Sequence, residues 1–193
     1  GAVGVMQMAS VDGVSLTDPA FAPVWREIDR RALPVLIHPS APPGTKYLDV
    51  MKYNLIASVG FMFDTSLAVR RMIFDGFFDR YPDLKLIAAH GGGALPYIAG
   101  RLDICYDNMP AARQRIGQRP SRYLKRIYYD SVVFQQKSLE LALEVGGADR
   151  VLYGSDYPHN IGDMKGCLAR VNALAPRVRD KVRGGNAMRI FRL

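Results

Sequence analysis

The chain has 193 residues, of which 49% are hydrophobic and 23% are charged, with a formal net charge of +8 at pH 7. This length suits one domain with a buried core, and the composition excludes an intrinsically disordered chain. No apolar run approaches the roughly 20 residues that span a bilayer, and no charged start followed by an apolar stretch marks a signal peptide. We treat residues 1–193 as one domain and expect a cytoplasmic protein with no membrane partner.

Short apolar runs alternate along the chain with stretches of helical periodicity. The runs predict strands near residues 2–8, 34–38, 84–90, 126–131 and 150–155. Because a helical stretch or a long connection separates each pair of runs, we expect an α/β fold with a parallel sheet and helices packed outside it.

The predicted helices fill most of the intervening sequence. The first begins at Thr17-Asp18-Pro19, where a capping side chain precedes proline, and ends near Arg31. An irregular loop opens at residues 41–44, and apolar spacing then predicts a helix over 65–78. Further helices are predicted over residues 94–107, 137–145, 163–173, 177–184 and 186–191.

Charge and cysteine content argue against two classes of site. The positive charge is concentrated in residues 113–126 and 170–192, without an aromatic-interleaved strand or a recognised nucleic-acid motif. We expect solvated helix surfaces, or a field that attracts small anions, and no nucleic-acid partner. Cys105 and Cys167 lie far apart without a CxxC pair, so we expect buried thiols and no thiolate zinc site.

Three predicted strands end on a side chain that can bind a metal or move a proton, namely His38, His90 and Asp156. Taken singly, each has a plain structural explanation as a packed histidine, part of a glycine turn or a helix cap. The carboxyl ends of parallel strands lie at one edge of a sheet, so we expect the three to converge there. Imidazole and carboxylate are suitable ligands for zinc, manganese or iron, and the pattern therefore favours one metal site.

The glycine run after His90 fits two known motifs poorly. His-Gly-Gly-Gly at 90–93 is similar to the oxyanion segment of lipases, but no Gly-x-Ser-x-Gly elbow follows. The same glycines do not meet the spacing of a dinucleotide fingerprint. They permit a tight turn or the close approach of a substrate.

Eight segments in chain order carry a family resemblance that covers essentially the whole sequence. They lie at 13–25, 34–39 (Pro-Val-x-Ile-His-Pro), 63–65 (Phe-Asp-Thr), 76–86, 89–96 (Ala-His-Gly-Gly-Gly-Ala-x-Pro), 100–102 (Gly-Arg-Leu), 153–158 (Tyr-Gly-Ser-Asp-Tyr-Pro) and 185–191. Together they resemble the amidohydrolase-related metal-dependent decarboxylases, particularly the aminocarboxymuconate semialdehyde decarboxylase family and its relatives acting on hydroxybenzoates and carboxyvanillate.

The resemblance implies the C-terminal portion of a (β/α)8 barrel, about strands four to eight, with one divalent metal ion at its carboxyl-terminal mouth. Zinc is expected, with manganese as the alternative. His38 and Asp156 match the metal ligands that follow the fifth and eighth strands. His90 matches the general acid or base that follows the sixth strand, beside a metal-bound water. The implied reaction is decarboxylation of a small aromatic or unsaturated carboxylic acid.

Three further residues are candidates for contact with the substrate. Arg101 matches an arginine that binds a substrate carboxylate, in some relatives across a dimer interface. Thr65 and His159 are expected to line the pocket, although a structural role is equally open for each. The resemblance also implies a homodimer or higher oligomer acting on a small-molecule carboxylate.

The sequence departs from the family in one respect. Relatives carry a His-x-His or Glu-x-His pair on their first strand, whereas the three histidines here are His38, His90 and His159. We therefore expect the C-terminal part of a longer enzyme, because catalytic metal sites take about three protein ligands plus water. Two alternatives stay open: a hydrolase of a lactone, C–C or C–N bond that uses the same site, and a non-catalytic fragment whose strand-end residues are vestigial.

Overall fold

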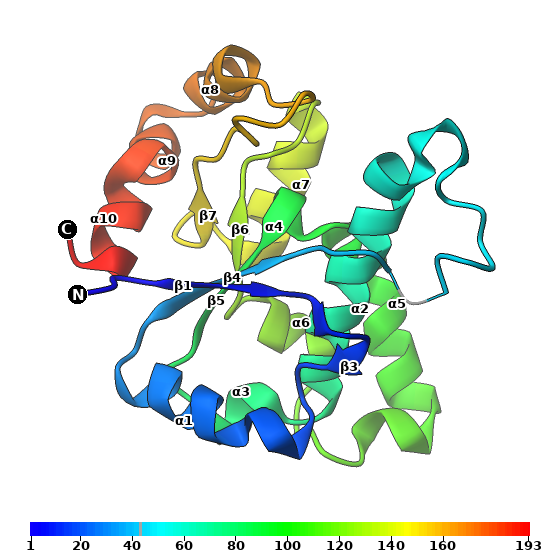
Figure 1. The fold of residues 1–193 in the computed structure, drawn as a ribbon. Coiled ribbons are helices and arrows are strands. Elements are labelled where there is room, and N and C mark those ends of the chain that lie inside the picture. Colours follow the sequence, from blue (N-terminus) through cyan, green and yellow to red (C-terminus); the bar gives the residue numbers. More distant parts are fainter. Residues whose placement is uncertain (43) are drawn as a thin grey trace.

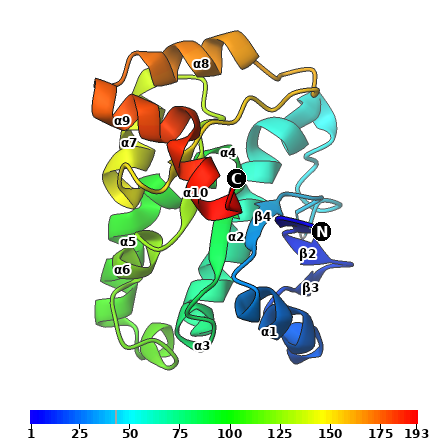
Figure 2. The same ribbon diagram turned by 90° about the vertical axis from the view of Figure 1, so that its left-hand side faces the viewer.

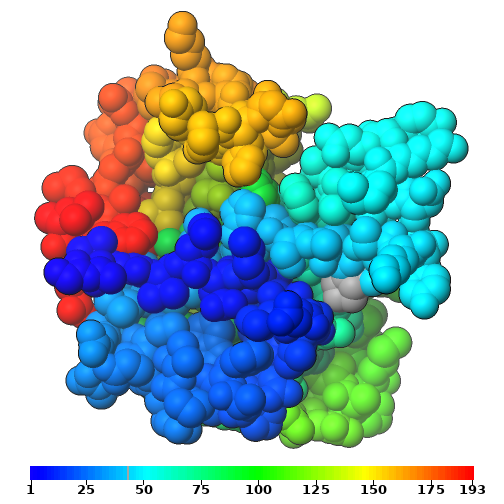
Figure 3. Space-filling view, in the orientation of Figure 1, coloured from blue at the N-terminus to red at the C-terminus, as the bar shows by residue number. Residues whose placement is uncertain are grey.

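The computed structural model of the protein describes residues 1–42 and 44–193. Pro43, which belongs to the predicted irregular loop, lies outside the described residues. A parallel sheet occupies the centre, and the segment that follows its second strand stands out as a lobe (Figures 1 and 3).

Among the described residues, five strands form the main sheet in the order in which they occur along the chain. They are β1 (Val5–Met8), β4 (Pro34–His38), β5 (Lys85–Ala88), β6 (Tyr128–Asp130) and β7 (Val151–Leu152). Each pairs in parallel with the next, with Met8 opposite His38 and Asp130 opposite Leu152. The five predicted strands are therefore confirmed, and their carboxyl ends share one edge of the sheet. The predicted strand over 84–90 is too long, because β5 ends at Ala88 and His90 lies in the turn of left-handed residues that follows it.

Helices connect the strands and cover the sheet (Figures 1 and 2). They are α1 (Ala22–Arg30), α2 (Phe61–Phe74), α3 (Phe77–Arg80), α4 (Ala89–Gly92), α5 (Leu95–Asn108), α6 (Pro120–Leu124), α7 (Gln136–Gly146), α8 (Met164–Asn172), α9 (Pro176–Asp180) and α10 (Asn186–Phe191). Shorter 3-10 turns lie at Pro19–Phe21, Lys52–Asn54 and Pro110–Arg113, and π-helical turns at Ile56–Gly60 and Lys181–Gly185.

The predicted helix over 65–78 is wrong in both its start and its continuity. It begins at Phe61, directly after a π-helical turn, and is divided into α2 and α3 by Gly76. Gly76 has φ 69°, and a Cβ there would lie 2.6 Å from the carbonyl oxygen of Arg115. The close approach of the two backbones requires glycine and ends α2.

The small antiparallel hairpin of β2 (Ser10–Val11) and β3 (Val14–Ser15) was not predicted. Its turn residues Asp12 and Gly13 both have positive φ, at 49° and 79°. Asp-Gly is a strong signal for such a two-residue turn, but each strand here has only two residues. Strands of two residues are too short to show a periodic pattern, so the hairpin was not recognised from the sequence.

Side chains alternate between the two faces of the sheet. Val35, Ile37 and Leu86 belong to the main core beneath the helices. Side chains on the opposite face form a smaller cluster with the C-terminal helix α10; it comprises Leu36, Ile87, Tyr128, Leu152, Ala187, Ile190 and Phe191. This inner face leads toward the carboxyl edge of the strands, where the candidate residues gather.

The basic segment 113–126 forms ion pairs at the surface. Arg115 pairs with Asp75, Arg119 with Asp107 and Arg126 with Asp79, which is typical of a solvated surface network. Cys167 is a buried thiol as predicted, whereas Cys105 is partly exposed. Among the described residues, no helix is long and apolar enough to cross a membrane.

Candidate functional site

Three strand ends bring His38, His90 and Asp156 together, as the strand pattern predicts. His38 is the last residue of β4, His90 lies in the short helix after β5, and Asp156 lies in the loop after β7. The His90 Nε2 is 3.5 Å from Asp156 Oδ1, and the His38 and His90 ring centroids are 5.5 Å apart. An imidazole, a carboxylate and a second imidazole therefore face one another at one edge of the sheet.

His90 and Asp156 both have left-handed backbone conformations, with φ of 57° and 59°. The three glycines after His90 also have positive φ, so the chain turns sharply as it leaves β5. Non-glycine residues in this region are strained, and such strain is concentrated at functional sites where the surroundings hold it. Both side chains are largely shielded, with exposed fractions of 12% for His90 and 10% for Asp156.

Asp130 holds this turn in place. Its carboxylate accepts hydrogen bonds from the backbone N–H groups of His90 (2.9 Å), Gly91 (2.8 Å) and Val132 (3.0 Å). Burial raises the pKa of the Asp130 carboxyl, while the nearby His90 and the three N–H donors act in the opposite direction. Asp130 is the last residue of strand β6 and so resembles the other candidates in its position, although it was not singled out from the sequence.

His38, Asp156 and His159 form a group that fits a divalent metal ion. Each offers one ligand atom, and these atoms all lie within 4.8 Å of one another. His38 Nδ1 donates a hydrogen bond to the carbonyl of Pro39 at 2.9 Å, which leaves the Nε2 lone pair free. A carbonyl partner of this kind is typical of metal-binding histidines, because it fixes the tautomer and the ring orientation. The donor set suits zinc, manganese or iron.

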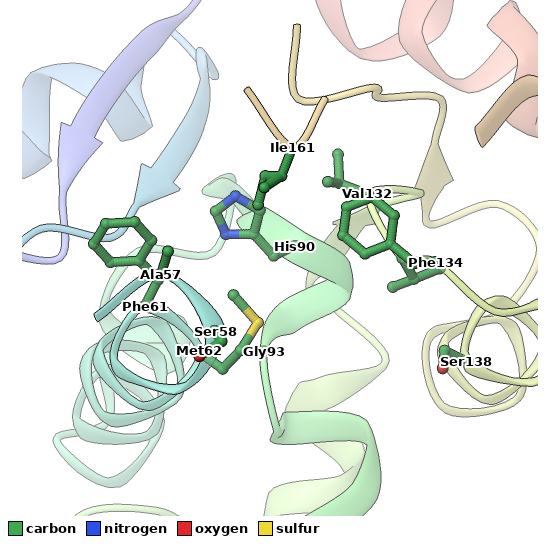
Figure 4. Close-up of a pocket in the computed structure, with 11 residues that line it drawn as sticks. Ala57, Ser58, Phe61, Met62, His90, Gly93, Val132, Phe134, Ser138 and Ile161 are labelled. Carbon is green, nitrogen blue, oxygen red and sulfur yellow. The ribbon is translucent and has the colours of Figure 1, made fainter. Parts of the chain in front are cut away.

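Two adjoining cavities meet at this edge of the sheet. The ligand cavity, of about 400 Å³, is lined at its polar end by His38, His90, Asp130, Asp156 and His159. The apolar pocket, of about 610 Å³, is lined by Ala57, Ser58, Phe61, Met62, His90, Gly93, Val132, Val133, Phe134, Ser138 and Ile161. His90 lines both, and Figure 4 shows it in the middle of the apolar pocket, between Phe61 on one side and Val132 on the other.

Thr65 and Arg101 line neither cavity. Thr65 is fully buried, and its Oγ1 has no hydrogen-bond partner among the described residues. Arg101 is exposed on α5. The neighbour of Thr65, Asp64, was not singled out from the sequence; it is buried and accepts a hydrogen bond from the Ser40 backbone N–H at 2.8 Å, which anchors the loop after His38.

Comparisons with known proteins identify the family of this chain. The amidohydrolase family profile matches residues 1–193. A 2-amino-3-carboxymuconate-6-semialdehyde decarboxylase from Dictyostelium discoideum is 29% identical over 196 residues, covering 100% of this chain and 54% of that protein. A gamma-resorcylate decarboxylase from a Rhizobium species is 28% identical, covering 91% of this chain and 55% of that protein.

Solved structures of decarboxylases are also similar to this chain. The 5-carboxyvanillate decarboxylase of Sphingomonas paucimobilis has a TM-score of 0.89 and 30% identity, covering 98% of this chain and 58% of that chain. The enzyme of the same name from Novosphingobium aromaticivorans, complexed with manganese and 4-hydroxy-3-methoxy-5-nitrobenzoic acid, has a TM-score of 0.89 and 27% identity, covering 100% of this chain and 57% of that chain. The chain thus spans little more than half the length of these relatives. Its parallel sheet and these matches confirm the predicted α/β fold as a C-terminal partial barrel.

Proposed function

Because the chain belongs to the amidohydrolase family, we propose that it forms the catalytic face of a metal-dependent decarboxylase of small aromatic or unsaturated carboxylic acids. The observation that carries the proposal is the position of His90, which lines both the ligand cavity and the apolar pocket. A proton donor at this junction reaches a substrate whose ring lies in the pocket. The relatives named above are decarboxylases, which favours this reaction over hydrolysis.

The apolar pocket suits an aromatic or unsaturated acid. Its volume of about 610 Å³ lies in the usual range for small-molecule sites of roughly 300–1,000 Å³. Phe61, Met62 and Phe134 provide apolar and aromatic surface for a planar group. A planar group bound against these walls would displace water from them, which would strengthen the electrostatic interactions around His90.

His90 is the proposed acid. A proton passes from His90 Nε2 to the carbon that bears the carboxylate, and that carbon becomes tetrahedral. The bond to the carboxylate then breaks, its electron pair returns to the unsaturated system, and neutral carbon dioxide leaves. His90 is left neutral and regains a proton from solvent. The chemistry of a divalent metal ion held by His38 and Asp156 would be that of a Lewis acid beside a negatively charged substrate oxygen.

Manganese and zinc are the two proposed ions. The Novosphingobium relative is complexed with manganese, which makes Mn²⁺ the first ion to test, and the nitrogen and oxygen donors of this site also suit zinc.

We also propose that the enzyme is a homodimer in which Arg101 contacts substrate bound to the partner subunit. Tyr97, Arg101 and Ile104 lie at i, i+4 and i+7 on one face of α5. Tyr97 is 85% exposed and Ile104 is 62% exposed. Exposed apolar side chains around an arginine are typical of a protein interface.

The test is release of carbon dioxide from a panel of hydroxybenzoates and carboxyvanillate, with Mn²⁺ or Zn²⁺ supplied. We expect His90→Ala to lower kcat by about 10²–10⁴-fold while Mn²⁺ binding is unchanged. Asn160→Ala, which changes an exposed residue outside both cavities, serves as the control and keeps its activity. Hydrolysis products without carbon dioxide would contradict the proposed reaction, and loss of Mn²⁺ from the His90→Ala variant would make His90 a ligand.

A further inference from the structure

We propose that His159 is a metal ligand, so that this chain supplies a set of three, His38, Asp156 and His159, to one divalent transition-metal ion. The sequence suggests only that His159 lines the pocket. The inference rests on the proposed function for the catalytic use of the ion, but the binding itself is tested separately.

The distances need only a small adjustment. The three ligand atoms lie within 4.8 Å of one another, and ligands about 2.1 Å from a common ion are about 3–3.5 Å apart. The His38 and His159 ring planes are 21° apart, with centroids separated by 6.3 Å. His159 is exposed, whereas His38 and Asp156 are partly buried, so rotation of the His159 side chain can close the remaining gap.

The loop after β7 folds back on itself and holds His159 beside Asp156. The His159 backbone N–H donates to the Asp156 carbonyl at 2.9 Å, and the Gly162 N–H donates to the His159 carbonyl at 2.9 Å. A Cβ at Gly162 would lie 2.7 Å from the Asp156 carbonyl oxygen, so this turn closes only with glycine. The backbone therefore fixes where the His159 side chain begins, and only its side-chain rotation remains to be ordered.

His159 lines the ligand cavity and does not line the apolar pocket. This separates it from the space proposed for the organic substrate and places it with the metal-binding atoms. Two neutral imidazoles and one carboxylate form the two-histidine, one-carboxylate set that binds divalent transition metals while leaving open positions. His38 and Asp156 would hold the ion from the protein side, and His159 from the solvent side.

The experiment titrates the metal-free protein with Mn²⁺ and follows loss of the electron paramagnetic resonance signal of free Mn²⁺. Spin-echo modulation then counts the histidine nitrogens on the bound ion. We expect one Mn²⁺ per chain with two histidine nitrogens for the unaltered protein. His159→Ala should weaken binding at least tenfold and leave one histidine nitrogen, while Asn160→Ala should match the unaltered protein.

Equal affinity and equal nitrogen counts in the His159→Ala variant and the unaltered protein would overturn the inference. Absence of Mn²⁺ binding by the unaltered protein would overturn it as well. Binding that depends on His159 without any release of carbon dioxide would support the ligand and refute the proposed reaction. Carbon dioxide release by the unaltered protein, together with equal Mn²⁺ binding by the His159→Ala variant, would support the proposed reaction and refute the ligand.

Discussion

The Asp130 carboxylate is bonded to the backbone around His90: Oδ2 accepts from the His90 N–H at 2.9 Å, and Oδ1 accepts from the Gly91 N–H at 2.8 Å. The contact fixes the left-handed turn from which the His90 ring projects. Asp130 thus acts on the proposed proton transfer as a positioning residue.

Asp130→Ala removes the acceptor of three backbone donors. We expect the free energy of unfolding to fall by at least about 2 kcal/mol, because hydrogen bonds to a charged group contribute about 1.5–3 kcal/mol each and are not additive. We also expect a larger effect on kcat than on KM, because the His90 ring is no longer held in the orientation needed for proton transfer. Denaturant unfolding and carbon dioxide release measure the two effects.

Asp103→Ala is the matched control. The Asp103 carboxylate accepts one backbone hydrogen bond, from Ser121 at 2.9 Å, and lines neither cavity. Its loss should lower stability less and leave kcat unchanged. A folded Asp130→Ala variant with normal kcat would show that Asp130 does not position His90.

Two glycines should respond in opposite ways to alanine. A Cβ at Gly93 would lie 2.5 Å from the Met62 carbonyl oxygen, and Gly93 has φ 62°, so α2 would have to move away from the glycine turn. We expect Gly93→Ala to lower the free energy of unfolding by at least about 2 kcal/mol and to disturb the apolar pocket. Gly100 is exposed within α5, and no atom of the described residues would contact a Cβ there within 4 Å, so Gly100→Ala should stabilise the protein by about 0.5–1 kcal/mol.

Thermal unfolding of the two variants checks the pair. A lower melting temperature for Gly93→Ala and a higher one for Gly100→Ala is the expected result. Equal melting temperatures would mean that α2 tolerates the displacement, and that close packing at Gly93 does not maintain the pocket wall.

The residues at the strand ends are the part of the candidate site that could be predicted from the sequence. His38 and Asp156 follow short apolar runs, and a parallel sheet brings such strand ends to one edge whatever the connections between them. The closeness of His159 to Asp156 depends on a turn closed by backbone hydrogen bonds and by Gly162, which no periodic pattern encodes. Thr65 was expected to line the pocket, and only the packing of α2 shows it to be buried away from both cavities.

The fold was predicted less well where elements are short. The division of 65–78 depends on contact between Gly76 and Arg115, which are distant in sequence. Residues 44–60 were expected only as part of a long connection, yet they end in a π-helical turn that leads into α2 and supplies Ala57 and Ser58 to the apolar pocket. Long-range packing sets these features, so local propensity does not reveal them.

Alkaline pH should destabilise the protein through Tyr123. Burial and the hydrogen bond from the Tyr123 hydroxyl to Asp79 raise its pKa to about 12, above an ordinary value near 10. The unfolded chain therefore loses this proton first, and the stability linked to it is complete below about pH 10 and is lost as the pH rises toward 12. We expect the free energy of unfolding, measured with denaturant, to fall as the pH rises from 9 to 12. The slope of this fall against pH should be shallower in Tyr123→Phe.

Tyr129 contributes in the same direction, because burial raises its pKa, so Tyr123→Phe should reduce the slope without abolishing it. Tyr47, which is 92% exposed, provides the control: Tyr47→Phe should leave the slope as it is in the unaltered protein. An unchanged slope in Tyr123→Phe would mean that the hydroxyl of Tyr123 ionises as readily in the folded protein as in the unfolded chain.

Mixed dimers test the proposed reach of Arg101 across an interface. Arg101→Ala and His90→Ala should each inactivate the enzyme as homodimers. In a hybrid, one site combines His90 of the first variant with Arg101 of the second, so random pairing should restore about one quarter of the original activity. Carbon dioxide release from the co-expressed variants measures this recovery. If Arg101 instead contacts substrate in its own subunit, each site of a hybrid lacks one of the two residues, and the co-expressed variants stay inactive. The control is a mixture of the separately purified variants without subunit exchange, which gives the baseline activity.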